Sequence, residues 1–337
     1  MTEKGTARDW MAVLSKYREP SHTRSITEIA ITVIPFIALW MAAYWALGVS
    51  YWLTLLISIP AAAFLVRMFM ILHDCAHGAF FRGKTANEWT GRVLGVLTMT
   101  PFDIWRRSHT IHHAGSGNLE RRGIGDIAML TVDEYKSRSW LGKLAYRAYR
   151  HPVTLFLLGP IYLFIIRHRW PDDVKKARWR CWISAMGTNA GILVISLFVI
   201  FVFGLKPFLL VYLPITVMAG ALGIWLFYVQ HQFEETFWER DEDWSMHDAA
   251  LYGSSHYDLP RPLRWLTANI GIHHVHHLYA RIPFYRLSKV LREHPRLADI
   301  RRMTILESLK CVKLQLWDEA GRKLVSFKEA RLIYKAA

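Results

Sequence analysis

Four long hydrophobic stretches dominate the chain, and each is long enough to cross a lipid bilayer. A transmembrane helix needs about 20 apolar residues, because it rises about 1.5 Å per residue through a hydrocarbon core of about 30 Å. The four stretches cover residues 26–49, 51–72, 181–204 and 207–228. Short turns around Ser50 and Lys206 join them in pairs. The pattern therefore predicts two transmembrane hairpins.

The remaining sequence favours helices over strands, so the predicted fold class is all-α. We expect a helix that begins at Thr85, with Glu88 three residues later completing a capping box, and that continues as an apolar run to residue 101. Residues 152–166 form another apolar run, which at about 15 residues is short for a crossing. We expect this run to be a helix that lies in the membrane interface.

The distribution of basic residues orients the hairpins. Within the four stretches the only basic residue is Arg67, and Lys206 lies in a turn. All other Lys and Arg residues fall before residue 26, within 73–180 or after residue 231. The positive-inside rule places these regions, and both chain ends, on the cytoplasmic side of an integral membrane protein. We therefore expect residues 1–337 to form one domain, in which 73–180 and 231–337 make a cytoplasmic helical cap.

Composition and charge exclude several other classes of protein. Hydrophobic residues make up 53% of the chain and charged residues 20%, which excludes a disordered protein. The net charge of +15 would suit a nucleic-acid partner, but a nucleic-acid binder needs its basic residues on one patch, and here hydrophobic hairpins divide them. Three cysteines without CxxC spacing support neither a disulfide framework nor a thiolate metal site.

The 16 histidines carry the main chemical signal, because eight of them form three compact motifs. The motifs are HxxxH at His73 and His77, HxxHH at His109, His112 and His113, and HxxHH at His273, His276 and His277. On a helix, positions i, i+3 and i+4 lie on one face, so each motif can direct its imidazoles toward a common point. His274 points about 100° away from His273 and is left out.

A ninth histidine, His231, lies near the end of the fourth hydrophobic stretch. The predicted topology brings it and the three motifs to the same membrane face. Nine imidazoles are too many for one tetrahedral zinc ion and suit two metals with four or five nitrogen ligands each. Such a site suits iron, although the number of imidazoles alone does not exclude zinc, copper or nickel.

Other polar residues are candidates for lesser roles. Ligating imidazoles usually donate their second nitrogen to a carboxylate or carbonyl oxygen. The candidates for that role are Asp74, Asp103, Asn118, Asp126, Glu234, Glu235 and Asn269. We expect six further histidines to be anchors at the membrane interface rather than ligands: His22, His151, His168, His247, His256 and His294.

The three motifs resemble the histidine boxes of the membrane fatty acid desaturases. The boxes read His73-Asp-Cys-Ala-His77, His109-Thr-Ile-His-His113 and His273-His-Val-His-His277. Flanking segments, at residues 99–105, 117–126, 230–235 and 281–286, resemble the bacterial branch of the family that is grouped with acyl-lipid desaturases. The resemblance covers about residues 73–287 and the hydropathy of the first hairpin.

The resemblance implies a non-haem di-iron enzyme of the bacterial cytoplasmic membrane. Such an enzyme uses O2 and two electrons to remove two hydrogens from adjacent carbons of a fatty acyl chain, carried by a lipid or an acyl carrier, and leaves a cis double bond. The eight box histidines and His231 would be the ligands. Phe227 stands where the acyl-CoA branch has an asparagine, so the outer shell would differ. The chain lacks a fused cytochrome b5 domain, so a separate ferredoxin- or rubredoxin-like protein with its reductase would supply the electrons.

Two other functions remain open at this point. Alkane hydroxylases and carotenoid hydroxylases or ketolases have similar histidine boxes and insert oxygen instead. A metal transporter or sensor would need polar groups within the spans, and apart from Arg67 we find little there that is ionisable.

Overall fold

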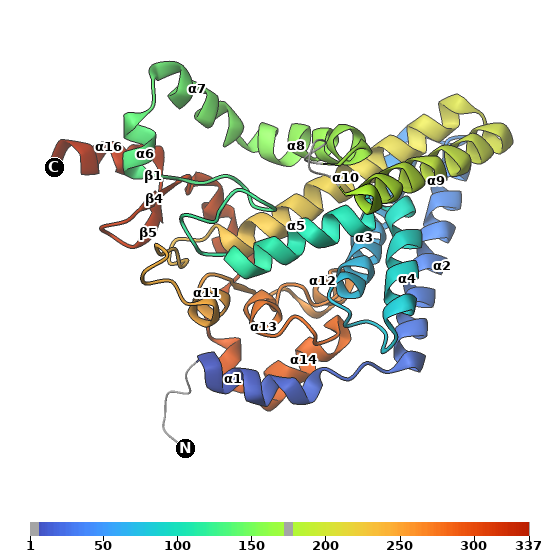
Figure 1. The fold of residues 1–337 in the computed structure, drawn as a ribbon. Helices are drawn as coiled ribbons and strands as arrows, with labels where there is room; N and C mark the ends of the chain where they lie inside the picture. The colour runs from blue at the N-terminus through green and yellow to red at the C-terminus, as the bar shows by residue number, and fades with distance from the viewer. Residues whose placement is uncertain (1–6, 172–177, 337) are drawn as a thin grey trace.

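Helices predominate in the computed structural model, which describes residues 7–171 and 178–336 (Figure 1). Within these residues four helices are long and apolar enough to cross a membrane. They are α2 (His22–Ala46), α3 (Tyr51–Ala76), α9 (Trp179–Phe203) and α10 (Leu205–His231). They form two sequential pairs, α2 with α3 and α9 with α10, so the structure confirms the four predicted membrane helices and the helical fold class.

Two of these helices extend beyond the C-terminal ends of the hydrophobic stretches that predicted them. α3 continues to Ala76 and α10 to His231, so that His73 and His231 are helical residues. Hydropathy marks where the apolar surface ends, whereas the helix continues for as long as its backbone hydrogen bonds are made. Between α9 and α10 the chain reverses at Gly204, whose φ of 91° is a conformation that favours glycine.

α3 is the central helix and α9 a peripheral one. α3 packs against α2, α4 and α10. In its most apolar 18-residue segment, 56% is buried, whereas only 6% of the corresponding segment of α9 is buried. α9 leaves side chains such as Phe201 almost fully exposed. Extended apolar surface of this kind suits contact with lipid rather than with water.

Arg67, the basic residue within the second stretch, is buried and paired. Its guanidinium forms an ion pair with Glu28 of α2, donates to Thr32 Oγ1 at 3.1 Å and lies 4.2 Å from the centre of the Trp265 ring. Glu28 lies within the first hydrophobic stretch but was not among the predicted residues. Removing one partner would leave a buried charge uncompensated, so the pair holds α2 and α3 together.

Short helices precede the second hairpin or follow it. α4 packs on α3, and α11, α13 and α14 gather below the membrane helices (Figure 1). The first set comprises α1 (Ala7–Leu14), η1 (Ser15–Tyr17), α4 (Lys84–Leu97), α5 (Phe102–Gly115), α6 (Val132–Ser137) and α7 (Trp140–Tyr149). The second comprises α11 (Met246–Tyr252), α12 (Arg261–Leu266), α13 (His273–Leu278), α14 (Phe284–Glu293), η5 (Pro295–Ala298), α15 (Ile305–Ser308), η6 (Leu309–Lys313) and α16 (Phe327–Ala336).

The few strands in the described residues are two or three residues long. One sheet has the order β1-β4-β5, and β2 pairs with β3 in parallel. β1 runs parallel to β4, and β5 runs antiparallel to β4. The strands are β1 (Leu130–Thr131), β2 (His256–Tyr257), β3 (Arg302–Met303), β4 (Leu316–Asp318) and β5 (Lys323–Val325).

The predicted capping box at Thr85 is wrong. α4 begins one residue earlier, at Lys84, and its N-cap is Gly83, which supplies no side-chain cap. The Glu88 carboxylate instead accepts a hydrogen bond from Arg106 of α5 at 3.1 Å. An ion pair between two helices has replaced the local backbone contact.

The short apolar run at 152–166 is helical and packs against α10. It consists of η2 (Thr154–Leu158), α8 (Gly159–Ile161) and η3 (Tyr162–Ile166), followed by η4 (Arg167–Arg169), and it is bent by 59° from α7. A Cβ on Gly220 of α10 would lie 2.8 Å from Pro160, so only glycine permits this approach. Its position in the membrane interface remains a prediction.

Candidate metal centre

The three histidine boxes and His231 come together from four helices. The first box ends α3, the second lies on α5, His231 ends α10 and the third box forms most of α13. α3 contacts both α5 and α10, and the histidines near the ends of these helices lie close to one another. Among the described residues, all nine predicted histidines fall into two groups that can hold a metal ion.

The larger group contains five histidines, drawn from all three boxes: His73, His77, His109, His113 and His276. One ring nitrogen from each lies within 4.8 Å of the others. The Nε2 atoms of His77 and His109 are 3.0 Å apart, and those of His109 and His113 are 3.1 Å apart. We call these five residues the first group.

The smaller group contains His112, His231, His273 and His277, again within 4.8 Å of one another. The Nε2 atoms of His231 and His273 are 3.0 Å apart. We call these four residues the second group. The two groups are neighbours, because the rings of His113 and His277 stack with their centres 4.0 Å apart.

The second and third boxes each divide between the groups, contrary to the expectation that a box directs all its imidazoles to one point. In both boxes the i and i+4 histidines share a group, while the i+3 histidine joins the other group. Adjacent positions such as His112 and His113 are about 100° apart around a helix. Each of these two helices therefore contributes to both groups.

The first and second groups have the properties of metal ligands. Burial, and secondarily the neighbouring imidazoles, lower the pKa of His109, His113 and His277 well below the usual value, so these rings are neutral. Within the described part of the chain, the buried Nε2 atoms of His73 and His112 have no hydrogen-bond partner. Two nitrogens about 2.1 Å from one ion and at right angles to each other would be about 3.0 Å apart, which is the spacing observed.

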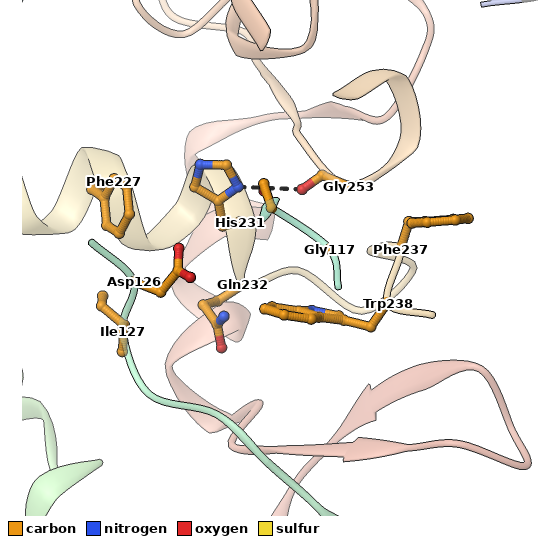
Figure 2. Close-up of a pocket in the computed structure, with 10 residues that line it drawn as sticks. Gly117, Asp126, Ile127, Phe227, His231, Gln232, Phe237, Trp238 and Gly253 are labelled. Carbon is orange, nitrogen blue, oxygen red and sulfur yellow. Dashed lines mark hydrogen bonds between the residues drawn. The ribbon is translucent and has the colours of Figure 1, made fainter. Parts of the chain in front are cut away.

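In three histidines of these groups the Nδ1 atom lies near a carboxylate or carbonyl oxygen. His112 Nδ1 lies 2.5 Å from Asp126 Oδ1, and His73 Nδ1 lies 3.3 Å from Asp74 Oδ1. His231 Nδ1 lies 3.4 Å from the Gly253 carbonyl oxygen (Figure 2). Bonds of this kind fix the tautomer of a ligating imidazole. Asp74 and Asp126 were among the predicted candidates, whereas Gly253 acts through a backbone oxygen that sequence does not reveal.

The other five candidates for that role have different surroundings. Two of them form ion pairs with arginines, Asp103 with Arg92 and Arg106, and Glu235 with Arg301. Two form hydrogen bonds with other side chains, Asn118 with Asp241 and Asn269 with Ser288. Glu234 is exposed. They stabilise the cap or lie on its surface rather than orienting ligands.

The remaining histidines lie outside both groups. His274 is buried, and its Nε2 donates to the Leu297 carbonyl oxygen at 2.7 Å, in keeping with its exclusion from the predicted ligands. The expectation of interface anchors is wrong for His168 and His256, because both are buried. His256 Nδ1 donates to the Ala298 carbonyl oxygen at 2.5 Å. These two histidines are packed inside the fold.

A large apolar cavity of about 730 Å³ adjoins the first group. Its walls come mainly from α3, α5 and α10, and both His73 and His109 line it. The indole of Trp105 stacks on His109 at a centroid distance of 4.4 Å and also lines the cavity. Its size lies within the range of about 300–1,000 Å³ that is usual for small-molecule sites. The site can therefore bring a long apolar molecule to the metal ligands.

A much smaller cavity of about 10 Å³ lies beside the second group (Figure 2). Asp126, His231, Gln232 and Trp238 line it together with Phe227. The Phe227 ring packs 5.2 Å from His112 and 5.1 Å from His231, centre to centre. Its side chain offers no polar atom at the position where the resemblance implied a different outer shell.

Comparison with known proteins identifies the family. A family model described as "Fatty acid desaturase" matches residues 50–307. A protein of Bacillus subtilis (strain 168) described as "Fatty acid desaturase" is 45% identical over 320 residues, which is 95% of this chain and 90% of that relative. The chain belongs to the fatty acid desaturase family. As a fatty acid desaturase it is an oxidoreductase, and the family uses iron.

More distant relatives include acyl-lipid desaturases. A Synechocystis protein described as "sn-1 acyl-lipid omega-3 desaturase (ferredoxin)" is 28% identical over 257 residues, covering 69% of this desaturase and 66% of the relative. Another Synechocystis protein, described as "sn-1 oleoyl-lipid 12-desaturase", is 28% identical over 236 residues and covers 65% and 62%. The family match includes all nine histidines of the two groups.

Proposed function

We propose that the first and second groups each hold one non-haem iron ion and that the enzyme introduces a cis double bond into a fatty acyl chain of a membrane lipid. O2 would be the co-substrate, and an external protein would supply two electrons. The observation that carries the proposal is the pair of adjacent histidine groups beside a large apolar cavity within a helical membrane protein.

The chain's own residues hold and orient the centre. Bound iron would supply the O2-dependent oxidation of unactivated C–H bonds, which amino-acid side chains cannot perform. His112 is held by Asp126, and His73 by Asp74. The second oxygen of the Asp74 carboxylate accepts the Phe284 backbone N–H at 2.6 Å, which ties the first box to α14. These contacts would hold the ligands in place for the metal.

The apolar cavity positions the substrate. Its walls of Phe69, Met70 and Trp105 would contact an apolar chain, and His73 and His109 of the first group also line it. An acyl chain lying in the cavity would therefore lie beside the first group. A lipid substrate agrees with the relatives described as acyl-lipid desaturases, and an acyl carrier is the alternative source of the chain.

The basic residues outside the membrane helices suit two partners, anionic lipid and an acidic electron donor. Both would lie on the cytoplasmic side of a bacterial cytoplasmic membrane. The exposed Arg107, on the same helix as the second box, is one of the basic residues near the cavity. A Lys or Arg near the membrane surface contributes about 1 kcal/mol toward binding anionic lipid. The same charge would attract an acidic ferredoxin- or rubredoxin-like donor, and one relative is described as a ferredoxin-dependent desaturase.

The function is tested by expressing the chain in a host that lacks desaturases, together with an electron donor, and analysing total fatty acids with double-bond location. We expect monounsaturated acids with the double bond at one main position, and none with the variant His277→Ala. Hydroxylated or oxo fatty acids would show that the site inserts oxygen. An unchanged lipid profile with the wild-type chain would contradict the proposal.

A further inference from the structure

We propose that Arg150 is a positioning residue for the second group, although it is not a ligand. Arg150 follows the last residue of α7 and is 1% exposed, so it is one of the most deeply buried side chains of the described residues. The proposal rests on the assignment of the second group as a metal site. Its evidence is that Arg150 joins the two segments that fix His112 and His231.

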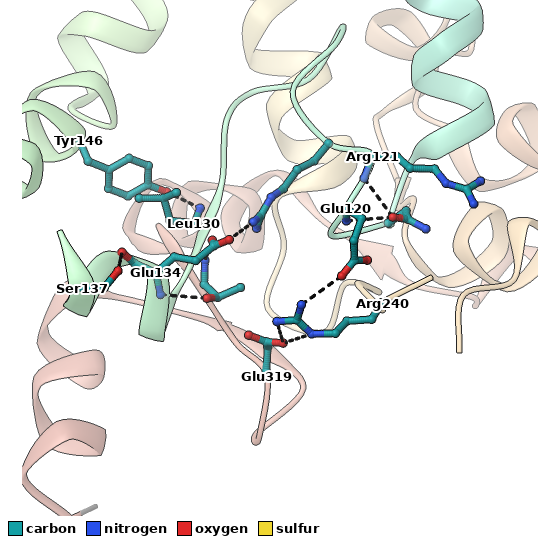
Figure 3. A network of polar contacts seen from close by, with 11 residues as sticks. Glu120, Arg121, Leu130, Glu134, Ser137, Tyr146, Arg240 and Glu319 are labelled. Atoms are coloured by element: carbon teal, nitrogen blue, oxygen red, sulfur yellow. Dashed lines mark hydrogen bonds and ion pairs between the residues drawn. The ribbon is translucent and has the colours of Figure 1, made fainter. Parts of the chain in front are cut away.

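The first connection runs to His112 through Asp126. Arg150 Nη1 donates to the Ala128 carbonyl oxygen at 3.1 Å, two residues after Asp126. Neighbouring tyrosines of α7 hold the same segment, because Tyr149 Oη accepts the Ala128 N–H at 2.9 Å and Tyr146 Oη accepts the Leu130 N–H at 3.1 Å. Figure 3 shows Tyr146 directed at Leu130. The end of α7 therefore fixes the backbone that presents Asp126 to His112.

The second connection runs to His231 through the end of α10. Arg150 Nη2 donates to Tyr228 Oη at 3.1 Å and to Gln232 Oε1 at 3.0 Å. Tyr228 lies almost one turn before His231, and Gln232 follows it directly. The guanidinium also lies 5.4 Å from the centre of the Tyr228 ring. Both flanks of His231 are thus tied to one side chain.

A third set of contacts joins Arg150 and Tyr228 to the C-terminal part of the chain. Arg150 Nη2 donates to the Leu314 carbonyl oxygen at 2.9 Å, and Tyr228 Oη donates to the Cys311 carbonyl oxygen at 2.9 Å. On the outside of this region, Arg240 pairs with Glu120 and Glu319 and links the same parts of the chain (Figure 3). Those outer pairs are exposed and contribute little, whereas the contacts of the Arg150 guanidinium are buried.

The charge of Arg150 makes this placement unusual. Within the described residues no carboxylate lies at ion-pair distance from Arg150, and its partners are carbonyl, amide and hydroxyl oxygens. Arg67 is equally buried but has Glu28 as its counter-ion. The planar guanidinium group of arginine can donate to several separate oxygens at once. The ammonium group of lysine, on a flexible side chain, does this less well. The geometry therefore requires arginine rather than any cation.

The connections of Arg150 lead to the second group and not to the first. Asp126 bonds His112, and α10 carries His231, both members of the second group. The first group is positioned by α3 and α5 and by the bond between Asp74 and His73. Loosening the Arg150 contacts should therefore weaken one metal site selectively.

The test compares Arg150→Lys with Arg67→Lys, the same substitution at an equally buried arginine whose contacts lie elsewhere. Iron-loaded protein in detergent is mixed with an excess of a chelator, and iron release is followed with time. We expect two release phases of equal amplitude for the wild type. Removing an outer-shell contact usually costs about 10–100-fold in metal affinity, so Arg150→Lys should accelerate one phase by about that factor and leave the other unchanged.

Arg67→Lys should change neither phase. If Arg150→Lys does not fold, Gln232→Ala removes one of the contacts alone and should accelerate the same phase to a smaller degree. Unchanged release from the folded variants, or equal acceleration of both phases, would overturn the proposal for Arg150. Wild-type protein that binds no iron would instead contradict the proposed function, so the two failures are distinguishable.

Discussion

His112→Ala is expected to lower bound iron from about two ions to about one per chain and to reduce desaturation at least about 100-fold. His112 belongs to the second group, and it is the member that Asp126 orients. Losing only an outer-shell partner costs about 10–100-fold in affinity or activity, and losing the ligand itself should cost no less. Metal analysis of purified protein and fatty acid profiling of the expressing host measure the two effects.

His274→Ala is the matched control for this experiment. His274 is a buried histidine in the third box, but its ring nitrogen donates to the Leu297 carbonyl oxygen and it lies outside both groups. We expect this variant to retain about two irons per chain even if the protein is less stable. Full iron content and product in His112→Ala would contradict the assignment of the second group.

Gly223→Leu is expected to slow desaturation of the longest accepted acyl chains at least about tenfold and to shift the preference toward shorter chains. Gly223 lines the large cavity, about two turns and about 12 Å before His231 on α10. A Cβ at this position would meet no atom within 4 Å, so a larger side chain can enter the cavity without disturbing the helix packing. One methylene in an apolar pocket can change specificity about 10- to 200-fold, and leucine adds four carbons.

Gly187→Leu is the control for added bulk on a membrane helix. Gly187 lies on α9, is exposed, and likewise has no atom within 4 Å of an added Cβ, but it does not line the cavity. Its product profile should equal that of the wild type. If Gly223→Leu also keeps the wild-type chain-length profile and rate, the acyl chain does not lie in this cavity.

The sequence was sufficient to predict the membrane helices and eight of the nine candidate ligands, because both depend on regular patterns, whereas His231 was predicted only from its place near the end of a hydrophobic stretch. Long apolar runs are required for any bilayer crossing, and helical spacing determines which side chains share a face. The same spacing did not predict that the second and third boxes would each contribute histidines to both groups. Whether His112 and His113 share a metal depends on the position of α13, which packs against the centre from a distant part of the chain.

Other parts of the site could not be predicted because they depend on tertiary contacts. The bond to His231 comes from the backbone of Gly253, which has no side chain to mark it. Of the seven candidate partners, only Asp74 and Asp126 lie near a ligand nitrogen, and proximity in sequence did not separate them from the others. The partner of Arg67 is Glu28, one helix away, and the size of the cavity depends on side chains from several helices that are distant in sequence.

The most direct test of the two-iron centre is to locate the metals by anomalous X-ray diffraction at the iron edge from crystals of the iron-loaded enzyme. Two anomalous peaks are expected, one bounded by His73, His77, His109, His113 and His276 and the other by His112, His231, His273 and His277. A single peak shared by both groups, or iron bound away from these histidines, would contradict the account.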